Sequence, residues 1–271
     1  MPPDELTGDD APPPELATAA RRAGTTSAVD LVATDAVPDP VAFMMNAEVE
    51  IEGRMPWSSN ATFLVTLRAD GTDRGPIEQR AIYKPVRGER PLWDFEPGLH
   101  RRERAAFLVS ERIGLGVVPP TVIRGGPVGQ GSFQWYVDAD HSEHYFTIYE
   151  QFDALHDQCR DIAVLDILAN NTDRKSGHCL LAGDRVWAID NGLCFSAPYK
   201  LRTVIWEFGG EPIDEAILDR VAPMVERIPV DIAVLLAQDE IAAMQRRAIA
   251  LVTERRLPDD DGGHHYPWPL I

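Results

Sequence analysis

The sequence has few cysteines and few basic residues. The three cysteines, Cys159, Cys179 and Cys194, match no metal-binding spacing, and so sparse and odd a set predicts reduced thiols in a cytoplasmic protein. There are 26 lysines and arginines against 43 aspartates and glutamates, so the net charge is −17. A chain this acidic is not expected to bind nucleic acid, or to bind an anionic bilayer through charge alone.

Long apolar runs are also absent. None approaches the roughly 18 residues that suggest a membrane-spanning helix, so no transmembrane segment is expected. The first residues, MPPDELTGDDAPPPE, are acidic and rich in proline, unlike a signal peptide. Residues 1–40 contain seven prolines and few large apolar side chains, which predicts a disordered leader.

The remaining chain has the composition of a globular protein, with 44% hydrophobic and 25% charged residues. Residues 41–140 are expected to form a small β-rich lobe with one helix, at 101–114. Its strands are expected at 61–67, 80–85, 119–124 and 131–138. Residues 141–256 are expected to form an α-rich lobe, and 257–271 an irregular C-terminal tail. The predicted fold class is therefore α+β, with two lobes and a cleft between them.

Two aspartates stand at the ends of a predicted hairpin in the second lobe. The short strands HCLL and RVWAI flank Gly183-Asp184, a favourable turn pair, so the hairpin should bring Asp173 and Asp190 to one site. One carboxylate could deprotonate an attacking hydroxyl, and the other could hold a magnesium ion on nucleotide phosphates. Considered separately, each aspartate is better explained by an ordinary turn.

Further features occur in the order that a two-lobed kinase requires. A Ser-Ser-Asn turn at residues 58–60 precedes a strand, Lys84 lies on the strand IYKP, and Glu103 lies near the start of the helix. Individually, Lys84 could be an ordinary strand-end lysine, and Glu103 a favourable charge at a helix N-terminus. Their order together favours a site for phosphoryl transfer from ATP.

These motifs give the sequence a family resemblance. The segments SSNATFLV, IYKP, ERAAFLVSERIGLGVVPPT, GSFQWYVD, VLDILANNTDR and AIDNGLCF follow one another in an order that resembles the phosphatidylinositol 3- and 4-kinases. The similarity covers roughly residues 45–210. It is nearest to the type II phosphatidylinositol 4-kinases and their bacterial relatives, including an actinobacterial group of kinase-like proteins.

The resemblance implies a role for each matching residue. Residues of the phosphate loop, the strand, the helix and the hinge would bind ATP, and residues of the two later loops would act on the phosphate and the metal. The implied ATP-binding residues are Ser58, Ser59, Asn60, Lys84, Glu103, Tyr136 and Val137. The implied catalytic residues are Asp173, Arg174 and Lys175, and the implied ligands of Mg²⁺ or Mn²⁺ are Asp190 and His178.

The sequence departs from the family pattern at its second metal position. The family usually has asparagine five residues after the catalytic aspartate, and this chain has His178. Imidazole is a poorer ligand for magnesium than an amide oxygen. This leaves three alternatives: a single ion carries the reaction, manganese is preferred, or His178 contacts phosphate. Lys175 could stabilise the transferring phosphoryl group or could face solvent.

The sequence leaves the acceptor and the reaction open. No palmitoylated cysteine cluster is present, and only Lys200 and Arg202 are basic in the segment after Asp190, which disfavours a membrane inositol lipid. A protein serine or threonine, or a soluble polyol, is the preferred acceptor. The alternatives to an active kinase are a pseudokinase, which binds nucleotide as a scaffold without phosphotransfer, and an enzyme that transfers the nucleotidyl group.

Overall fold

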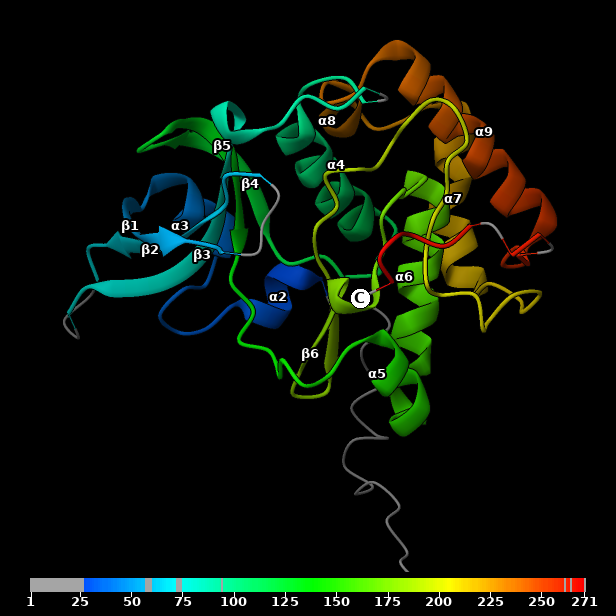
Figure 1. Cartoon of the computed structure of the whole chain (residues 1–271), viewed down its shortest axis with the longest axis horizontal. Coiled ribbons are helices and arrows are strands. Elements are labelled where there is room, and N and C mark those ends of the chain that lie inside the picture. Colours follow the sequence, from blue (N-terminus) through cyan, green and yellow to red (C-terminus); the bar gives the residue numbers. More distant parts are fainter. Residues whose placement is uncertain are drawn as a thin grey trace, which may run out of the picture.

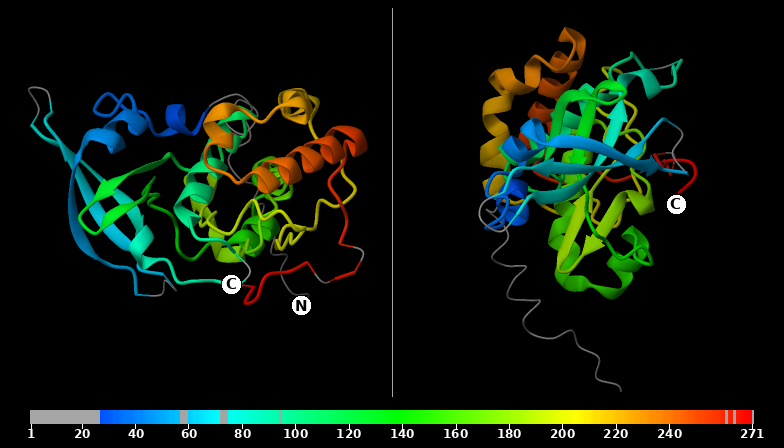
Figure 2. Two further views of the ribbon diagram at one scale, coloured as in Figure 1. Left: turned by 90° about the horizontal axis from the view of Figure 1, so that it is seen from above. Right: turned by 90° about the vertical axis from the view of Figure 1, so that its left-hand side faces the viewer.

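The computed structural model describes residues 27–56, 60–71, 75–93, 95–260, 262–263 and 265–270. Within these ranges the fold is mixed α+β. A five-stranded antiparallel sheet lies at one end of the molecule, and helices α6, α7 and α9 lie at the other (Figures 1 and 2). Each end has its own cluster of buried apolar side chains. The expected α+β class is confirmed, whereas the lobe boundaries at residues 41–140 and 141–256 stay a prediction.

The elements are labelled in chain order (Figure 1). The strands are β1 (Glu48–Arg54), β2 (Phe63–Ala69), β3 (Ile77–Pro85), β4 (Thr121–Gly126), β5 (Gly129–Trp135), β6 (Cys179–Ala182) and β7 (Arg185–Ala188). The α-helices are α2 (Ala28–Val32), α3 (Pro40–Asn46), α4 (Leu99–Arg112), α5 (Tyr145–Gln151), α6 (His156–Ala169), α7 (Glu215–Glu226), α8 (Val230–Ala233) and α9 (Gln238–Glu254).

The five-stranded sheet has the order β1-β2-β3-β5-β4. Successive side chains along each strand point to opposite faces of the sheet. On β3, Ala81 and Tyr83 are fully buried, and Tyr83 stacks on Phe133 of β5 at 4.3 Å between ring centroids. Helix α3 packs against the sheet through β2, β4 and β5. Because side chains alternate along a strand, Lys84 projects from the opposite face to Tyr83.

The second sheet is the predicted hairpin. Strands β6 and β7 pair antiparallel from Cys179↔Ala188 to Ala182↔Arg185. Gly183 has a φ of 62°, a left-handed conformation that glycine adopts without a steric cost, so the tight turn at Gly183-Asp184 is explained. The hairpin follows α6, and the loops at its open end carry the residues of the candidate site.

The prediction of a disordered leader is wrong for residues 27–40. Ser27 and Asp30 form a capping box that starts α2, and Ala28 is fully buried. The amide of Ala28 donates a 2.7 Å hydrogen bond to the Glu111 side chain of α4. A short segment can be ordered in this way by tertiary contacts that its own composition does not reveal. Residues 1–26 lie outside the described residues.

No helix in the described part of the chain is both long enough and apolar enough to cross a membrane. The three cysteines are all buried free thiols.

Candidate active site

Lys84 joins three elements that are far apart in the sequence. Its Nζ atom lies 2.5 Å from Oε1 of Glu103 and 2.8 Å from Oδ1 of Asp190. These partners are 19 and 106 positions away, on α4 and in the loop after β7. Three of the sequence-predicted residues therefore meet at one point. The two carboxylates raise the pKa of Lys84 although burial opposes this, so the ammonium stays charged.

The position of Glu103 is set by the N-terminal end of α4. The helix begins after Gly98, whose φ of 111° suits glycine. Glu89 accepts hydrogen bonds from the backbone amides of Gly98 and His100 and so caps the helix from the connection that precedes it. Only 4% of the Glu103 side chain is exposed. A carboxylate this deeply buried requires partners, and Lys84 is one of them.

The second partner of Glu103 is the loop that carries Asp190. The backbone amide of Asn191 donates a 3.1 Å hydrogen bond to Oε2 of Glu103. Asp190 itself has a φ of 56°, which is uncommon for a residue other than glycine and is found at functional sites. Lys84 chiefly, with Lys175, holds the pKa of Asp190 well below its usual range. Asp190 is thus an ionised carboxylate, and half of its side chain is exposed.

His178 lies between the two aspartates. Its Nδ1 atom is 2.8 Å from the backbone carbonyl oxygen of Asp173, and its Nε2 atom is 3.5 Å from Oδ2 of Asp190. A carbonyl only accepts, so the short contact places the ring proton on Nδ1 and leaves the Nε2 lone pair facing Asp190. The amide of Lys175, 3.4 Å from Nδ1, makes the longer and weaker contact. Burial lowers the pKa of His178, which favours the neutral ring.

Asp173 is the second carboxylate of the site. Its Oδ2 atom lies 3.0 Å from Nζ of Lys175, and its amide donates to Oδ1 of Asn171. Burial raises the pKa of Asp173, while the hydrogen bond and charge of Lys175 oppose the shift. A carboxylate with a raised pKa is a better proton acceptor than an ordinary exposed one. Because Lys175 is paired with Asp173, the interpretation of it as a lysine that simply faces solvent is wrong.

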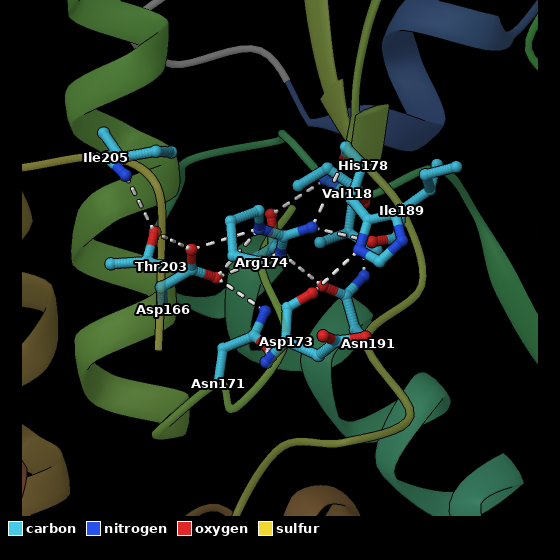
Figure 3. A network of polar contacts seen from close by, with 12 residues as sticks. Val118, Asp166, Asn171, Asp173, Arg174, His178, Ile189, Asn191, Thr203 and Ile205 are labelled. Carbon is cyan, nitrogen blue, oxygen red and sulfur yellow. Dashed lines mark hydrogen bonds and ion pairs between the residues drawn. The ribbon is translucent and has the colours of Figure 1, made fainter. Parts of the chain in front are cut away.

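The prediction that Arg174 is a catalytic residue is not supported by its position. Arg174 is fully buried, and its guanidinium lies at the centre of a polar network (Figure 3). It donates to Asp166, to Oδ1 of Asn191 at 2.6 Å, and to the carbonyl of Ile189 at 2.7 Å. Each guanidinium nitrogen has a partner, so Arg174 positions the two loops and has no donor directed at a substrate.

Asp166 was not predicted and anchors this network. It lies on α6, is fully buried, and accepts hydrogen bonds from Arg174, Asn171 and Thr203 (Figure 3). A buried carboxylate persists only when it is paired and hydrogen-bonded. The sequence does contain a signal, because a single aspartate interrupts the apolar run AVLDILA of the helix.

The predicted phosphate loop lies at the β1–β2 connection. Ser58 and Ser59 lie outside the described residues. Asn60 is described, and its Oδ1 accepts a 2.9 Å hydrogen bond from the amide of Arg90. This hydrogen bond links the β1–β2 connection to the segment after β3, which begins next to Lys84 in the sequence.

The predicted hinge follows β5. The amide of Tyr136 donates a 3.2 Å hydrogen bond to the carbonyl of Arg80 on β3. Tyr136 also lines a cavity of about 410 Å³ together with Arg80, which lies on the same face of β3 as Lys84. Val137 is half-buried beside Tyr136. The structure therefore joins this segment to β3, while its contact with adenine stays a prediction.

The C-terminal segment reaches the loop that follows Asp173, which the sequence did not indicate. The amide of Ser176 donates a 2.8 Å hydrogen bond to the carbonyl of Leu270, and the amide of Thr203 donates to the carbonyl of His265. Figure 1 shows the end of the chain passing back towards the centre of the molecule. The described residues of the tail predicted at 257–271 form no helix or strand, and Leu270 lies beside Ser176.

Several solved structures resemble the fold weakly. CtkA, a proinflammatory kinase of Helicobacter pylori, aligns at 11% identity and a TM-score of 0.43, covering 79% of this chain and 94% of CtkA. Hydra Fam20 with sugar aligns at 14% and 0.48, covering 88% and 93%. The Golgi casein kinase with Mn and ADP bound aligns at 13% and 0.48, covering 85% and 79%. Values this low carry no conclusion about activity.

The sequence comparison is more specific. No protein-family model matches the chain, so the resemblance to phosphatidylinositol 3- and 4-kinases stays a prediction. Protein Rv2133c of Mycobacterium tuberculosis (strain ATCC 25618 / H37Rv) is 36% identical over 271 residues, covering 86% of this chain and 96% of that protein. The chain therefore belongs to the same protein family as Rv2133c.

Proposed function

We propose that the protein is an ATP-dependent kinase that transfers the γ-phosphoryl group to a hydroxyl acceptor. The observation that carries the proposal is the position of Lys84, whose Nζ lies between Glu103 and Asp190, with Asp173 on the far side of His178. Phosphoryl transfer needs charge neutralisation and positioning more than covalent help from the protein. A partly buried lysine, an ionised aspartate and an aspartate with a raised pKa supply these functions.

Each residue has a distinct part in the proposed reaction. Lys84 would bind a phosphate of ATP, while Glu103 keeps its ammonium charged and oriented. Asp173 would accept the proton of the acceptor hydroxyl as its oxygen attacks the γ-phosphorus. The bond between that phosphorus and the β–γ bridging oxygen breaks, and ADP leaves with the electron pair. Lys175, which is paired with Asp173 at 3.0 Å, lies where it can offset charge on the transferring group.

The residues present fit a divalent ion that is held mainly by the nucleotide. Within the described chain no group of three or more His, Cys, Asp or Glu side chains could hold a metal ion. Magnesium in such sites is often bound by one or two carboxylates together with substrate phosphates, and Asp190 provides one ionised carboxylate. Oδ2 of Asp190 faces the lone pair of His178, and an imidazole ligand favours Mn²⁺ over Mg²⁺. The ion would neutralise phosphate charge.

The acceptor is proposed to be a protein serine or threonine or a soluble polyol. The net charge of −17 opposes approach to an anionic bilayer, which an inositol lipid would require. The division into two lobes with ATP between them, and the hinge at Tyr136 and Val137, belong to the same proposal.

The test separates binding from turnover. The full chain is incubated with ATP, Mg²⁺ or Mn²⁺, and either a serine-containing peptide mixture or inositol. Nucleotide affinity is measured by calorimetry, and ADP by chromatography. The kinase proposal predicts that Asp173→Asn binds ATP as the wild type does but produces at least about 10²-fold less ADP, the usual size of a general-base contribution. Wild-type protein that binds ATP but releases no ADP under any of these conditions would indicate a pseudokinase.

A further inference from the structure

A second cavity lies away from the Lys84 site. It has a volume of about 560 Å³, within the range of small-molecule sites. Its wall includes the C-terminal half of α9, Ile167 near the end of α6, and segments around residues 197–199 and 256–259. None of the residues assigned above to ATP or to the metal lines it. Figure 1 shows α6 and α9 at the helical end of the molecule, away from the sheet.

Arg247 in the cavity wall has an unsatisfied donor. Its Nε donates a 2.8 Å hydrogen bond to the carbonyl of Leu168, but its Nη2 is buried and has no hydrogen-bond partner within the described residues. A buried donor without a partner costs about 1–3 kcal/mol, and more when the group is charged. Burial lowers the pKa of Arg247 to about 10, so the guanidinium is still cationic at neutral pH.

The charge of the wall favours an anion. Arg246, Arg247 and Arg256 line the cavity, against the carboxylates Glu254 and Asp259. One donor of Arg256 is already used, since its Nη1 donates to the carbonyl of Gly210 at 2.7 Å. In a chain whose net charge is −17, a wall with more guanidinium than carboxylate groups is a local exception. A ligand carboxylate in the cavity could pair with the guanidinium of Arg247.

The remainder of the wall is apolar. Ile167, Ala243, Leu251 and Leu257 contribute hydrocarbon surface around the arginines. A bare inorganic anion would leave this surface in contact with water, whereas an acid with an alkyl or aryl body would cover it.

We propose that this cavity binds a small organic acid, with its carboxylate on Arg247 and its apolar body against α6 and α9. The wall of the cavity is hydrogen-bonded to Asn170, which ends α6 and lies three positions before Asp173. Ala197 and Tyr199 belong to a segment whose Ser196 and Pro198 carbonyls both accept 2.8 Å hydrogen bonds from the Asn170 side chain. The proposal does not depend on kinase activity, because the cavity and its charge exist whether or not phosphotransfer occurs.

The test compares octanoate with 1-octanol by calorimetry on the full chain. The two probes have the same alkyl body and differ in charge. Octanoate is expected to bind saturably at one site, about tenfold or more tighter than octanol, because a charge-assisted hydrogen bond is stronger than a neutral one. Arg247→Gln should weaken octanoate binding by about tenfold or more, whereas Arg247→Lys should retain part of the affinity.

Two further variants keep the test decisive if Arg247→Gln is poorly folded. Ala250→Phe fills the cavity from an exposed position of α9 and should abolish binding of both probes. Arg227→Gln, at an exposed position outside the cavity, should bind octanoate as the wild type does. Equal affinity for the acid and the alcohol, full binding by Arg247→Gln, or no saturable binding up to about 1 mM would overturn the proposal.

Discussion

Nη2 of Arg174 donates a 2.6 Å hydrogen bond to Oδ1 of Asn191, and this contact connects the loop of Asp173 to the loop of Asp190. The backbone amide of Asn191 in turn donates to Glu103 on α4. Asn191 therefore also contacts the glutamate that pairs with Lys84. The geometry of the candidate site thus depends on a residue that faces no substrate. Figure 3 shows Arg174 enclosed by its partners.

Removing Arg174 should therefore act on stability. Arg174→Met leaves Asp166 buried without its counter-charge, and breaking a buried pair in this way costs about 3–5 kcal/mol. Urea unfolding followed by circular dichroism measures the change. The exposed control Arg227→Met should alter the free energy of unfolding by no more than about 0.5 kcal/mol.

The double variant Asp166→Leu with Arg174→Met extends this test. It should be more stable than Arg174→Met alone, since no unpaired charge remains buried. If Arg174→Met keeps wild-type stability but loses phosphotransfer, Arg174 contacts a substrate and the positioning role is wrong.

The pH dependence of ADP production should report Asp173. A general base must be deprotonated, and burial raises the pKa of Asp173, so the rate should rise with pH through a value above the usual range for aspartate. Lys175 favours the charged carboxylate, so Lys175→Met should move this acid limb to higher pH. If the acid limb of Lys175→Met lies at the wild-type pH while kcat falls, Lys175 acts on the phosphoryl group and not on the pKa of Asp173.

His178 should control the choice of metal. Replacing the imidazole with an amide oxygen in His178→Asn supplies a harder ligand beside Asp190, so the ratio of Mg²⁺-supported to Mn²⁺-supported ADP release should rise by about tenfold or more. The exposed control His141→Asn should leave the ratio unchanged. An unchanged ratio in His178→Asn would show that His178 does not contact the ion.

Glu89 should contribute stability that acid removes. Burial alone would raise its pKa, but hydrogen bonds from the His100 ring and the amides of Gly98 and His100 lower it to about 2. Because the folded pKa is below the usual 4.5, the contribution is complete above about pH 4.5 and is lost as the pH falls to about 2. Glu89→Gln should lose about 1 kcal/mol at pH 7, a typical helix-cap value.

Urea unfolding of Glu89→Gln at pH 7 and pH 3 provides the measurement. The difference from the wild type should shrink at the lower pH. The exposed Glu96→Gln should differ little from the wild type at either pH. A Glu89→Gln deficit that is equal at both values would contradict the role of the carboxylate.

The sequence predicted the elements that carry strong local patterns. The strand of Lys84, the helix of Glu103 and the hairpin before Asp190 all form, because alternation, helical periodicity and a Gly-Asp turn are local signals. The resemblance implied that Lys84, Glu103 and Asp190 belong to one ATP site, but it implied no contact between Lys84 and Asp190. The structure places Nζ of Lys84 within hydrogen-bond distance of both carboxylates.

The remaining features depend on contacts between distant parts of the chain. Arg174 follows Asp173 directly, but adjacency does not show that its side chain turns into the interior towards Asp166 on α6. The contact of Ser176 with Leu270 likewise joins segments that no local pattern relates. Residues 27–40 were predicted as disordered because their composition is poor in large apolar residues, although α2 is fixed by α4. Such contacts between distant segments exist only in the folded molecule, so local sequence patterns do not predict them.

The most direct test of the kinase account is product analysis beside Asp190→Asn. The full chain is incubated with ATP, Mg²⁺ or Mn²⁺ and the acceptor mixture, and ADP, AMP and pyrophosphate are quantified together. The account predicts ADP with a phosphorylated acceptor, reduced by about 10²-fold or more in Asp190→Asn because an ionised group that stabilises charge is lost. Pyrophosphate with a nucleotidylated product, or ADP release that Asp190→Asn leaves unchanged, would contradict it.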